Sequence, residues 1–347
     1  DWSSDVCSSD LSQEVFRMNY QKTVLVTGAG GYVGSKLVPE LISKDYKVLA
    51  VDTYWYGEKV FKDEFNEKLK VIKLDIRNQE ALRDVLSGVT DVIHLACISN
   101  DPSFDLNPQL GKSINLDAFE PLVHLAKESG VQRFIYASSS SVYVVKEESR
   151  VTEGLSLNPL TDYSKYKMIC EEILSKYVTN DFVGVTLRPA TVCGWSPRQR
   201  FDLSVNILTN LAVNKNEITV FGGTQFRPNI HIDDMVQAYL LMLESPTNLI
   251  NGSVFNVGFE NLSLNEIAIE VSKHTNVKNI IHTSTNDLRS YRVDSQKICN
   301  QLGFKFQKTV ADAIKDIVKA FRDNKYSDSL NNPLYFNIKR MQQLGLS

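Results

Sequence analysis

The sequence has 347 residues, of which 43% are hydrophobic, so the chain is long and apolar enough to bury a sizeable core. Its formal net charge is −3 and its isoelectric point is near 6.0. This charge balance provides no basic field for a nucleic-acid backbone or an anionic membrane surface, so neither partner is expected.

The cysteines form no CxxC pair, and no histidine stands near them at metal-ligand spacing, so no metal site is predicted. They are Cys7, Cys97, Cys170, Cys193 and Cys299. No run approaches the ~20 apolar residues of a membrane span, and the first residues lack a basic stretch followed by an apolar one. A reduced, cytoplasmic protein is therefore expected.

Residues 1–17 are rich in Ser and Asp, have no hydrophobic period, and precede Met18, which leads directly into a strand. We interpret them as a non-native or disordered arm and Met18 as the native start. A disordered arm that is native to the protein is the alternative.

Short β-branched runs alternate with helical stretches over residues 18–190, and this rhythm is typical of a parallel sheet wound with helices. Strands that are apolar throughout suit a sheet covered on both faces. The sequence thus predicts an α/β fold with a Rossmann-type, doubly wound parallel sheet. The expected strands are Thr23–Thr27, Val48–Val51, Lys70–Leu74, Val92–Leu95, Arg133–Ala137 and Val183–Leu187.

The rhythm breaks after Arg188 into loops rich in Gly, Pro and Asn. A short strand near Thr219–Phe221 and a helix near Asp233–Leu243 are expected there, and residues 191–347 are assigned mainly to a smaller C-terminal lobe. A strand at Val254–Val257 is expected to return to the main sheet, so that the two lobes interleave.

A glycine pattern follows the first strand, with Gly28, Gly31 and Gly34 in a GxxGxxG layout before a helix-like stretch, Ser35–Ser43. Gly28 permits a tight turn, Gly31 lets backbone N–H groups approach a pyrophosphate, and Gly34 allows close packing of helix on strand. This predicts a dinucleotide site, although an ordinary glycine-rich turn gives the same letters.

Asp52 ends the second strand and follows Gly34 by 18 residues, close to the spacing of the acid that binds the adenosine ribose. A carboxylate there would repel a 2′-phosphate, which favours NAD over NADP. A turn or capping aspartate is the alternative. Asp75 and Ile76, just past the third strand, are candidates for contact with the adenine.

Tyr163 and Lys167 stand four residues apart at the start of a helix-like run, so they share one helix face. A serine run, residues 138–141, follows the fifth strand, and strand ends of an open parallel sheet border its ligand crevice. A packed aromatic and a solvated lysine are the alternative reading of the pair.

In order and spacing, the glycine pattern, Asp52, the serine run before Val142 and the YxxxK pair resemble the extended short-chain dehydrogenase/reductases. Within these, the NAD-dependent epimerase/dehydratase family, with its UDP-glucose 4-epimerase-like nucleotide-sugar enzymes, is the most similar. The resemblance covers nearly all of Met18–Phe321. It implies NAD as cofactor, a nucleoside-diphosphate sugar as substrate, a homodimer, and a C-terminal lobe that binds the substrate.

The resemblance implies that Tyr163 is the catalytic acid/base, that Lys167 bridges the nicotinamide ribose and lowers the tyrosine pKa, and that Ser139 hydrogen-bonds the reacting hydroxyl. Asn115 is implied to support the active-site backbone on the nicotinamide side, with a capping role as the alternative. The full set of cofactor-binding residues is Gly28, Gly31, Tyr32, Val33, Gly34, Asp52, Asp75, Ile76, Leu95, Ala96, Cys97, Asn115, Tyr163, Lys167 and Ala190.

On the substrate side, the resemblance makes Arg227 the candidate clamp of the diphosphate, and a guanidinium suits phosphate through its bidentate fork. Arg289 or Arg292 is either a second clamp or a surface charge. His231 is read as a helix-entry or packing histidine. The predicted substrate contacts are Ser99, Asn100, Ser139, Thr191, Arg227 and Arg289.

Two departures from the family pattern affect function. Thr191 stands where the family often has Asn, and Ser140 and Ser141 stand where the 4,6-dehydratases carry Asp-Glu, so dehydration is ranked low. Epimerisation, with C4 the expected carbon, is the leading function. A reductase or dehydrogenase of a keto-sugar nucleotide and a non-catalytic NAD-binding protein are the alternatives.

Overall fold

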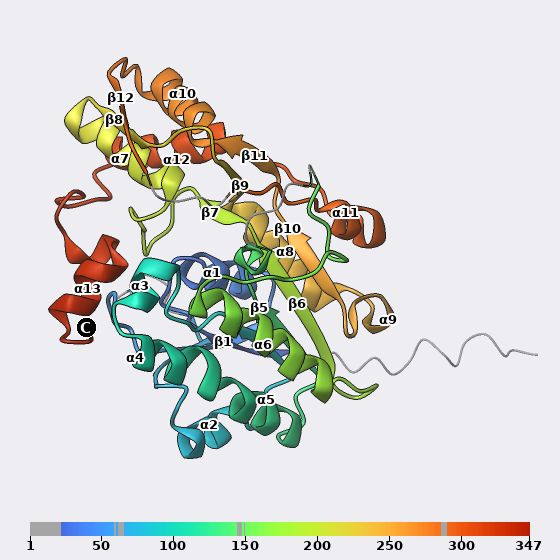
Figure 1. Ribbon diagram of the computed structural model, residues 1–347. Helices are drawn as coiled ribbons and strands as arrows, with labels where there is room; N and C mark the ends of the chain where they lie inside the picture. The colour runs from blue at the N-terminus through green and yellow to red at the C-terminus, as the bar shows by residue number, and fades with distance from the viewer. Residues whose placement is uncertain (1–21, 59, 62–65, 144–147, 149, 286–289) are drawn as a thin grey trace, which may run out of the picture.

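The computed structural model describes residues 22–347 except 59, 62–65, 144–147, 149 and 286–289 (Figure 1). The predicted arm, residues 1–17, and the proposed start at Met18 lie outside the described residues.

The main sheet has seven strands in the order β10-β6-β5-β4-β1-β2-β3, and every neighbouring pair is parallel. The Rossmann-type, doubly wound sheet predicted from the sequence is confirmed. The strand expected near Val254 pairs with β6 at the edge of this sheet. The strands are β1 (Thr23–Thr27), β2 (Lys47–Asp52), β3 (Leu69–Lys73), β4 (Asp91–His94), β5 (Arg133–Ala137), β6 (Val183–Pro189) and β10 (Val254–Val257).

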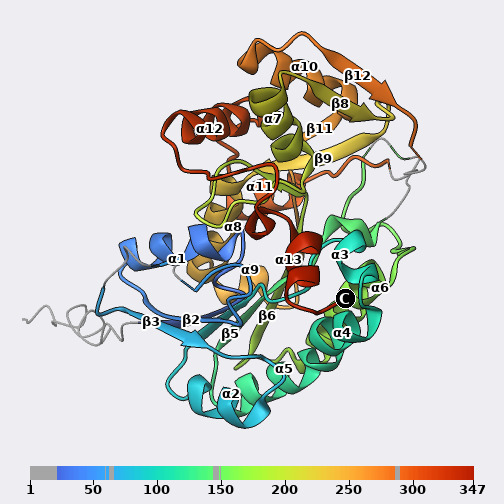
Figure 2. The same cartoon turned by 90° about the vertical axis from the view of Figure 1, so that its left-hand side faces the viewer.

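Helices cover both faces of this sheet, as Figures 1 and 2 show. Val24 and Val26 of β1 belong to the core under α1 and α8, whereas Leu25 between them belongs to the core under α2, α5 and α6. Burial on both faces explains why the strands lack polar alternation. The helices are α1 (Gly34–Ser43), α8 (Ile232–Glu244), α2 (Gln79–Leu86), α5 (Phe119–Glu128) and α6 (Asp162–Tyr177).

The position of α8 differs from the sequence prediction, which assigned this helix to the smaller lobe. Met235, Val236 and Tyr239 are buried in the core of the main sheet, and α8 contacts α1. An apolar helix face is equally suited to either lobe, so the sequence pattern alone does not choose its partner.

The smaller lobe contains a three-stranded sheet, β11-β9-β7, and a two-stranded sheet, β12-β8. Helices α7, α10 and α12 pack around a separate apolar core. Its elements are β7 (Thr191–Cys193), β8 (Ile218–Phe221), β9 (Phe226–His231), β11 (Glu260–Ser263), β12 (Ile280–Thr283), α7 (Ser204–Lys215), α10 (Leu264–Thr275) and α12 (Val310–Arg322).

Shorter elements connect these parts, and α13 leaves the smaller lobe to lie beside α3 of the Rossmann lobe (Figure 2). They are α3 (Asp101–Asp105), α4 (Pro108–Lys112), the π-turn η1 (Ser113–Asp117), the 3₁₀ turn η2 (Ser140–Val142), α9 (Thr247–Ile250), α11 (Gln296–Leu302), the 3₁₀ turn η3 (Pro333–Tyr335) and α13 (Asn337–Gln343).

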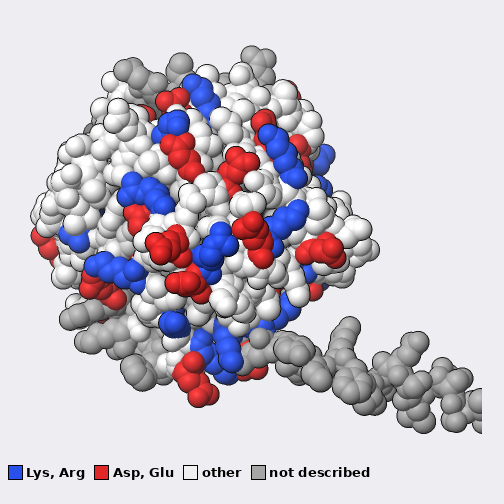
Figure 3. Space-filling model, turned by 90° about the horizontal axis from the view of Figure 1, so that it is seen from below, with Lys and Arg blue, Asp and Glu red and all other residues white. Residues whose placement is uncertain are grey.

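The lower face of the molecule carries acidic and basic side chains that are interspersed (Figure 3). No extended area of one sign dominates this face, which therefore lacks the basic stripe of a nucleic-acid-binding surface. Among the described residues, no helix is both long and apolar enough to cross a membrane.

His94 is a buried titratable group in the core of the main sheet. Its Nδ1 lies 2.7 Å from the hydroxyl oxygen of Thr27, and its ring packs against Phe119, Phe134 and Tyr136. Burial, assisted by the charge of Lys167, lowers the pKa of His94 to about 3. The folded protein therefore holds this imidazole neutral where an unfolded chain would protonate it.

We expect the free energy of unfolding to fall as the pH falls from about 6.5 towards 3, because over this interval the unfolded chain binds a proton that the folded chain does not. The contribution of His94 is about 1.4 kcal/mol per pH unit at most. Urea unfolding at several pH values should give a shallower dependence for His94→Asn than for the parent. The surface variant His124→Asn should keep the parental slope, and equal slopes for all three proteins would contradict the assignment.

Candidate functional site

A cavity of about 540 Å³ lies at the carboxyl ends of the main-sheet strands and is also lined by residues of the smaller lobe. Ligands of open parallel sheets bind in this position. The predicted site residues that line it are Gly28, Gly31, Tyr32, Val33, Gly34, Asp52, Asp75, Ile76, Leu95, Ala96, Cys97, Ser99, Asn100, Ser139, Tyr163, Lys167, Ala190, Thr191 and Arg227.

The glycine loop has the geometry that its sequence pattern predicts. Gly28 adopts a φ of +74°, and a Cβ added there would lie 2.6 Å from the backbone nitrogen of Ala96. A Cβ on Gly34 would lie 2.4 Å from the carbonyl oxygen of Gly28. The loop can therefore turn into α1 and pack against it only without these side chains, leaving backbone groups at the helix N-terminus beside the cavity.

Asp52 faces the same end of the cavity. One carboxylate oxygen accepts a hydrogen bond of 2.9 Å from the Gly30 N–H, and the other accepts one of 2.7 Å from the Tyr54 N–H. Burial raises the pKa of Asp52, and the two backbone donors partly oppose that rise. A carboxylate oxygen accepts more than one hydrogen bond, so Asp52 retains capacity for ribose hydroxyls.

Asp75 lines the cavity beyond Asp52 and is paired with Arg77 at 2.6 Å. The hydrogen bonds from Arg77 are the largest cause of the lowered pKa of Asp75. Contact of Asp75 and Ile76 with an adenine stays a prediction.

Ser139, Tyr163 and Lys167 meet at the ends of β5 and α6. A capping box between Thr161 and Ser164 begins α6, which places Tyr163 in its first turn. The Ser139 side chain lies near enough to the phenol of Tyr163 to favour a lower pKa, against the larger effect of burial. The Lys167 ammonium donates a 2.6 Å hydrogen bond to the Ala137 carbonyl.

The expected lowering of the Tyr163 pKa by Lys167 is not found in the protein alone. The ammonium lies 6.0 Å from the centre of the tyrosine ring and is directed to the Ala137 carbonyl. Burial is the dominant effect and raises the pKa of Tyr163 above its ordinary value. A cationic cofactor bound in the cavity would oppose this rise.

Asn115 corrects one predicted cofactor contact, because its side chain does not line the cavity. Its amide exchanges two hydrogen bonds with the backbone of Ile98, at 2.8 and 2.9 Å. It thus holds the loop after β4, in agreement with the supporting role implied by the resemblance and not with a capping role.

The sequence reading missed two cations on the opposite wall, Arg198 and Arg200. Arg200 donates to the Ser99 hydroxyl at 2.9 Å and pairs with Asp202 at 2.8 Å. Among the residues that the structure describes, its Nη2 is buried without a hydrogen-bond partner. The sequence did contain a signal for these two residues: both arginines lie in the loop that follows β7, and loops after strand ends border the ligand crevice.

Arg227, on β9, lines the cavity from the smaller lobe. Its proposed companion Arg289 lies outside the described residues. Arg292 is not at the cavity: its guanidinium stacks on the Phe226 ring at 3.6 Å. This stacking accounts for the Arg292 side chain without a ligand, and a second clamp at Arg289 or Arg292 stays a prediction.

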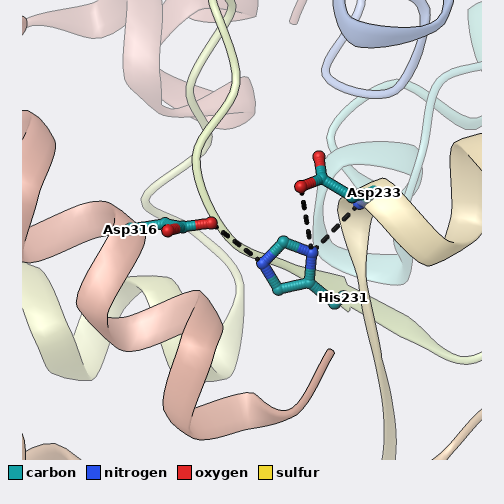
Figure 4. A group of neighbouring side chains, drawn as sticks. All are labelled: His231, Asp233 and Asp316. Atoms are coloured by element: carbon teal, nitrogen blue, oxygen red, sulfur yellow. Dashed lines mark hydrogen bonds and ion pairs between the residues drawn. The ribbon is translucent and has the colours of Figure 1, made fainter. Parts of the chain in front are cut away.

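His231 is the N-cap of α8, as the sequence reading suggested (Figure 4). Its Nδ1 accepts a 3.1 Å hydrogen bond from the Asp233 N–H, and its Nε2 lies 3.2 Å from an Asp316 oxygen. Lys308 contacts both carboxylates. The side chains of His231, Asp233 and Asp316 lie close enough together to share a metal ion. Each nitrogen of the His231 ring already has a protein partner, however, so helix capping and the ion pairs of Lys308 account for the cluster.

Comparisons with known proteins agree with this site. Residues 24–258 match the family model "NAD dependent epimerase/dehydratase family". The chain is 30% identical to an uncharacterized UDP-glucose epimerase, YtcB, of Bacillus subtilis (75% of this chain, 84% of the relative). It is 27% identical to the UDP-glucose 4-epimerase of Lactobacillus helveticus (72% and 81%).

Among solved structures, the chain resembles the UDP-glucuronic acid 4-epimerase of Bacillus cereus in complex with UDP-glucuronic acid and NAD. The TM-score is 0.79 with 26% identity, covering 87% of this chain and 99% of that one. The chain belongs to the NAD-dependent epimerase/dehydratase family, and it is an enzyme that uses NAD as cofactor.

Asp52 should set the preference for NAD over NADP, because a 2′-phosphate would meet its carboxylate in a poorly solvated place. Asp52→Ala should relax this preference by about 1–2 kcal/mol, the order of a charged hydrogen bond. Calorimetric titration with both dinucleotides measures it. Asp75→Ala is the control, because its loss should affect both dinucleotides alike. Equal affinity of the parent for NAD and NADP would refute the assignment.

Proposed function

We propose that the protein is an NAD-dependent epimerase of a nucleoside-diphosphate sugar, acting at C4 through a transient keto sugar. The observation that carries the proposal is the meeting of Ser139, Tyr163 and Lys167 in a cavity that the Arg227 guanidinium lines from the smaller lobe. The first group suits proton transfer at a hydroxyl, and the second suits an anionic diphosphate.

In this proposal, the phenol of Tyr163 takes the proton of the sugar hydroxyl and later returns it. Ser139, whose side chain lies near the phenol, orients the same hydroxyl. The Lys167 ammonium, anchored on the Ala137 carbonyl, stabilises the deprotonated phenol. Bound NAD supplies the hydride acceptor and donor, and no net redox change results.

The smaller lobe is proposed to hold the nucleotide part of the substrate. Arg227 on β9 is the diphosphate clamp, while Ser99, Asn100 and Thr191 line the part of the cavity assigned to the sugar. The relatives named above carry UDP-glucose or UDP-glucuronic acid in their names, which supports a UDP-sugar.

Net oxidation or reduction of a keto-sugar nucleotide is the alternative, because it would use the same three residues. Dehydration ranks lower: Ser140, which stands in place of a dehydratase carboxylate, lies 3.2 Å from the hydroxyl of Tyr291. A non-catalytic NAD-binding protein would not need Ser139 and Tyr163 together in the cavity wall. The homodimer and the cytoplasmic location stay predictions.

A panel of UDP-, GDP-, CDP- and dTDP-sugars, incubated with and without added NAD and analysed by NMR, tests the proposal. An isomeric sugar nucleotide without accumulation of NADH is expected. A stoichiometric change of NAD or NADH would favour the dehydrogenase, and binding without turnover would favour the non-catalytic protein.

Tyr163→Phe keeps the buried ring but removes the proton-carrying hydroxyl, so the variant should fold and bind NAD while turnover falls by ~10²–10⁴-fold. Tyr166→Phe, which loses the same group on the same helix outside the cavity, is the matched control. Steady-state kinetics and thermal unfolding measure the two effects. Near-parental turnover of Tyr163→Phe would end the proposed mechanism.

Arg227→Ala should weaken the binding of a nucleoside diphosphate by about tenfold to a hundredfold, the order of a charged hydrogen bond, and leave the binding of the free sugar almost unchanged. Arg292→Ala is the control, since Arg292 is stacked on Phe226 away from the cavity. Calorimetry with UDP measures the change. An unaltered UDP affinity would remove Arg227 from the site.

A further inference from the structure

Residues 323–347, which we call the C-terminal strap, cross from the smaller lobe to the Rossmann lobe (Figure 2). Met341 of the strap is fully buried in the apolar core that lies under α2 and α5. The Arg340 side chain donates to the Trp55 carbonyl, and the Asn107 amide donates to the Leu346 carbonyl at 3.2 Å. The strap is therefore anchored beside the cavity on the far lobe.

The strap also holds the loop that carries Arg198 and Arg200. Phe201 lies at the centre of an aromatic cluster, and its N–H donates to the Tyr335 carbonyl at 2.9 Å. The N–H of Asn337 donates to the Asp202 carboxylate at 3.0 Å. The loop at 198–202 is thus fixed to the strap at two consecutive residues. The rings of the cluster are Phe201, Phe321, Tyr326 and Tyr335.

Asn337 brings the strap into the cavity wall, where it is only 3% exposed. Its side-chain oxygen accepts a 2.7 Å hydrogen bond from Nη2 of Arg198. Its amide nitrogen donates to the Ser99 hydroxyl at 3.1 Å. Because both ends of the amide are engaged, Asn337 fixes the direction of the Arg198 guanidinium.

Arg198 lies at the dinucleotide end of the cavity. The backbone N–H of Arg198 donates a hydrogen bond to the hydroxyl of Ser35, in the first turn of α1. The Arg198 guanidinium stacks on the Tyr56 ring, 3.7 Å from its centre. It is also near enough to Asp52 to oppose, in part, the rise that burial causes in the pKa of that carboxyl. These neighbours belong to the glycine loop and the predicted ribose site, and not to the serine run.

The guanidinium of Arg198 is a buried cation that lacks a full set of partners. Its Nε is buried without a hydrogen-bond acceptor among the residues that the structure describes. Desolvation lowers the pKa of Arg198 to about 10, although Asp202 and Asp52 lie nearby. A buried donor without an acceptor is costly, so its presence in a cavity wall indicates an anionic ligand.

Each of the other cations of the described cavity wall has protein partners. Lys167 is bonded to the Ala137 carbonyl, Arg200 to Ser99 and Asp202, and Arg227 to the Phe226 carbonyl. Arg198 is the cavity cation whose backbone is bonded to the first turn of α1, next to the loop where a dinucleotide presents its two negative phosphates.

We propose that Arg198 binds the pyrophosphate of the dinucleotide, and that Asn337 of the C-terminal strap is the positioning residue that holds its guanidinium there. The site of the cofactor is then completed by Asn337, a residue 139 positions beyond Arg198 in the chain. This inference rests on NAD binding and not on the proposed epimerisation, so either can fail without the other.

The test uses protein loaded with radiolabelled NAD and measures the rate of NAD release during a chase with unlabelled NAD. Arg198→Met should accelerate release by about tenfold to a hundredfold, the order of a lost charged hydrogen bond. Asn337→Ala should accelerate it by a smaller factor. In the double variant the release rate should equal that of Arg198→Met, because Asn337 acts through Arg198.

Gln342→Ala is the matched control, since Gln342 is an exposed residue of the same helix, and it should release NAD at the parental rate. Arg198→Lys keeps the charge but loses the planar fork, so it should be intermediate and insensitive to Asn337→Ala. Thermal unfolding establishes that each variant is folded.

Two results would overturn the proposal. If Arg198→Met releases NAD at the parental rate but binds UDP more weakly in calorimetry, Arg198 serves the diphosphate of the substrate. If Asn337→Ala accelerates NAD release equally with and without Arg198, the strap stabilises the lobe generally and Asn337 is not a positioning residue.

Discussion

A buried ion pair between Glu171 and Arg188 fixes the catalytic helix on the main sheet. The Arg188 guanidinium donates to the Glu171 carboxylate at 2.6 and 3.0 Å, and the Ser138 hydroxyl donates to the same carboxylate. Tyr163, Lys167 and Glu171 repeat every four residues and so share one face of α6. Removing one partner of such a pair costs about 3–5 kcal/mol, which makes rotation of the helix away from the strand ends unfavourable.

The same network explains why the lobes interleave. Arg188 donates to the Tyr143 hydroxyl at 2.6 Å, and Tyr143 donates to the Asn256 side chain of β10 at 2.7 Å. The returning strand β10 therefore supplies, through Asn256, a hydrogen-bond partner to Tyr143 and so to the network of Arg188 and Glu171. The proposed proton-transfer groups come from the Rossmann lobe, whereas three of the cavity cations, Arg198, Arg200 and Arg227, come from the chain after β6. The anionic ligands that we propose would therefore bind where the two lobes meet.

Most of the main sheet could be predicted because its strands are apolar on both faces, and the glycine loop, Asp52 and the pair Tyr163 and Lys167 are recognised by local spacing. The lobe to which α8 belongs could not be predicted, because the apolar face of a helix can pack against either lobe. Arg198 and Asn337 are 139 positions apart, so their contact follows only from the assembled fold. The raised pKa of Tyr163 results from burial, which no motif records.

The central claim is that the nucleotide sugar loses its C4 hydride to bound NAD and that the resulting keto sugar regains this hydride on the opposite face of C4 within the same cavity. Its most direct test is turnover of a nucleotide sugar that carries deuterium at C4, followed by NMR in ordinary water. The account predicts that the epimer retains the deuterium at C4 and that no deuterated NADH is released. Loss of the deuterium to solvent, or its appearance in free NADH, would contradict it.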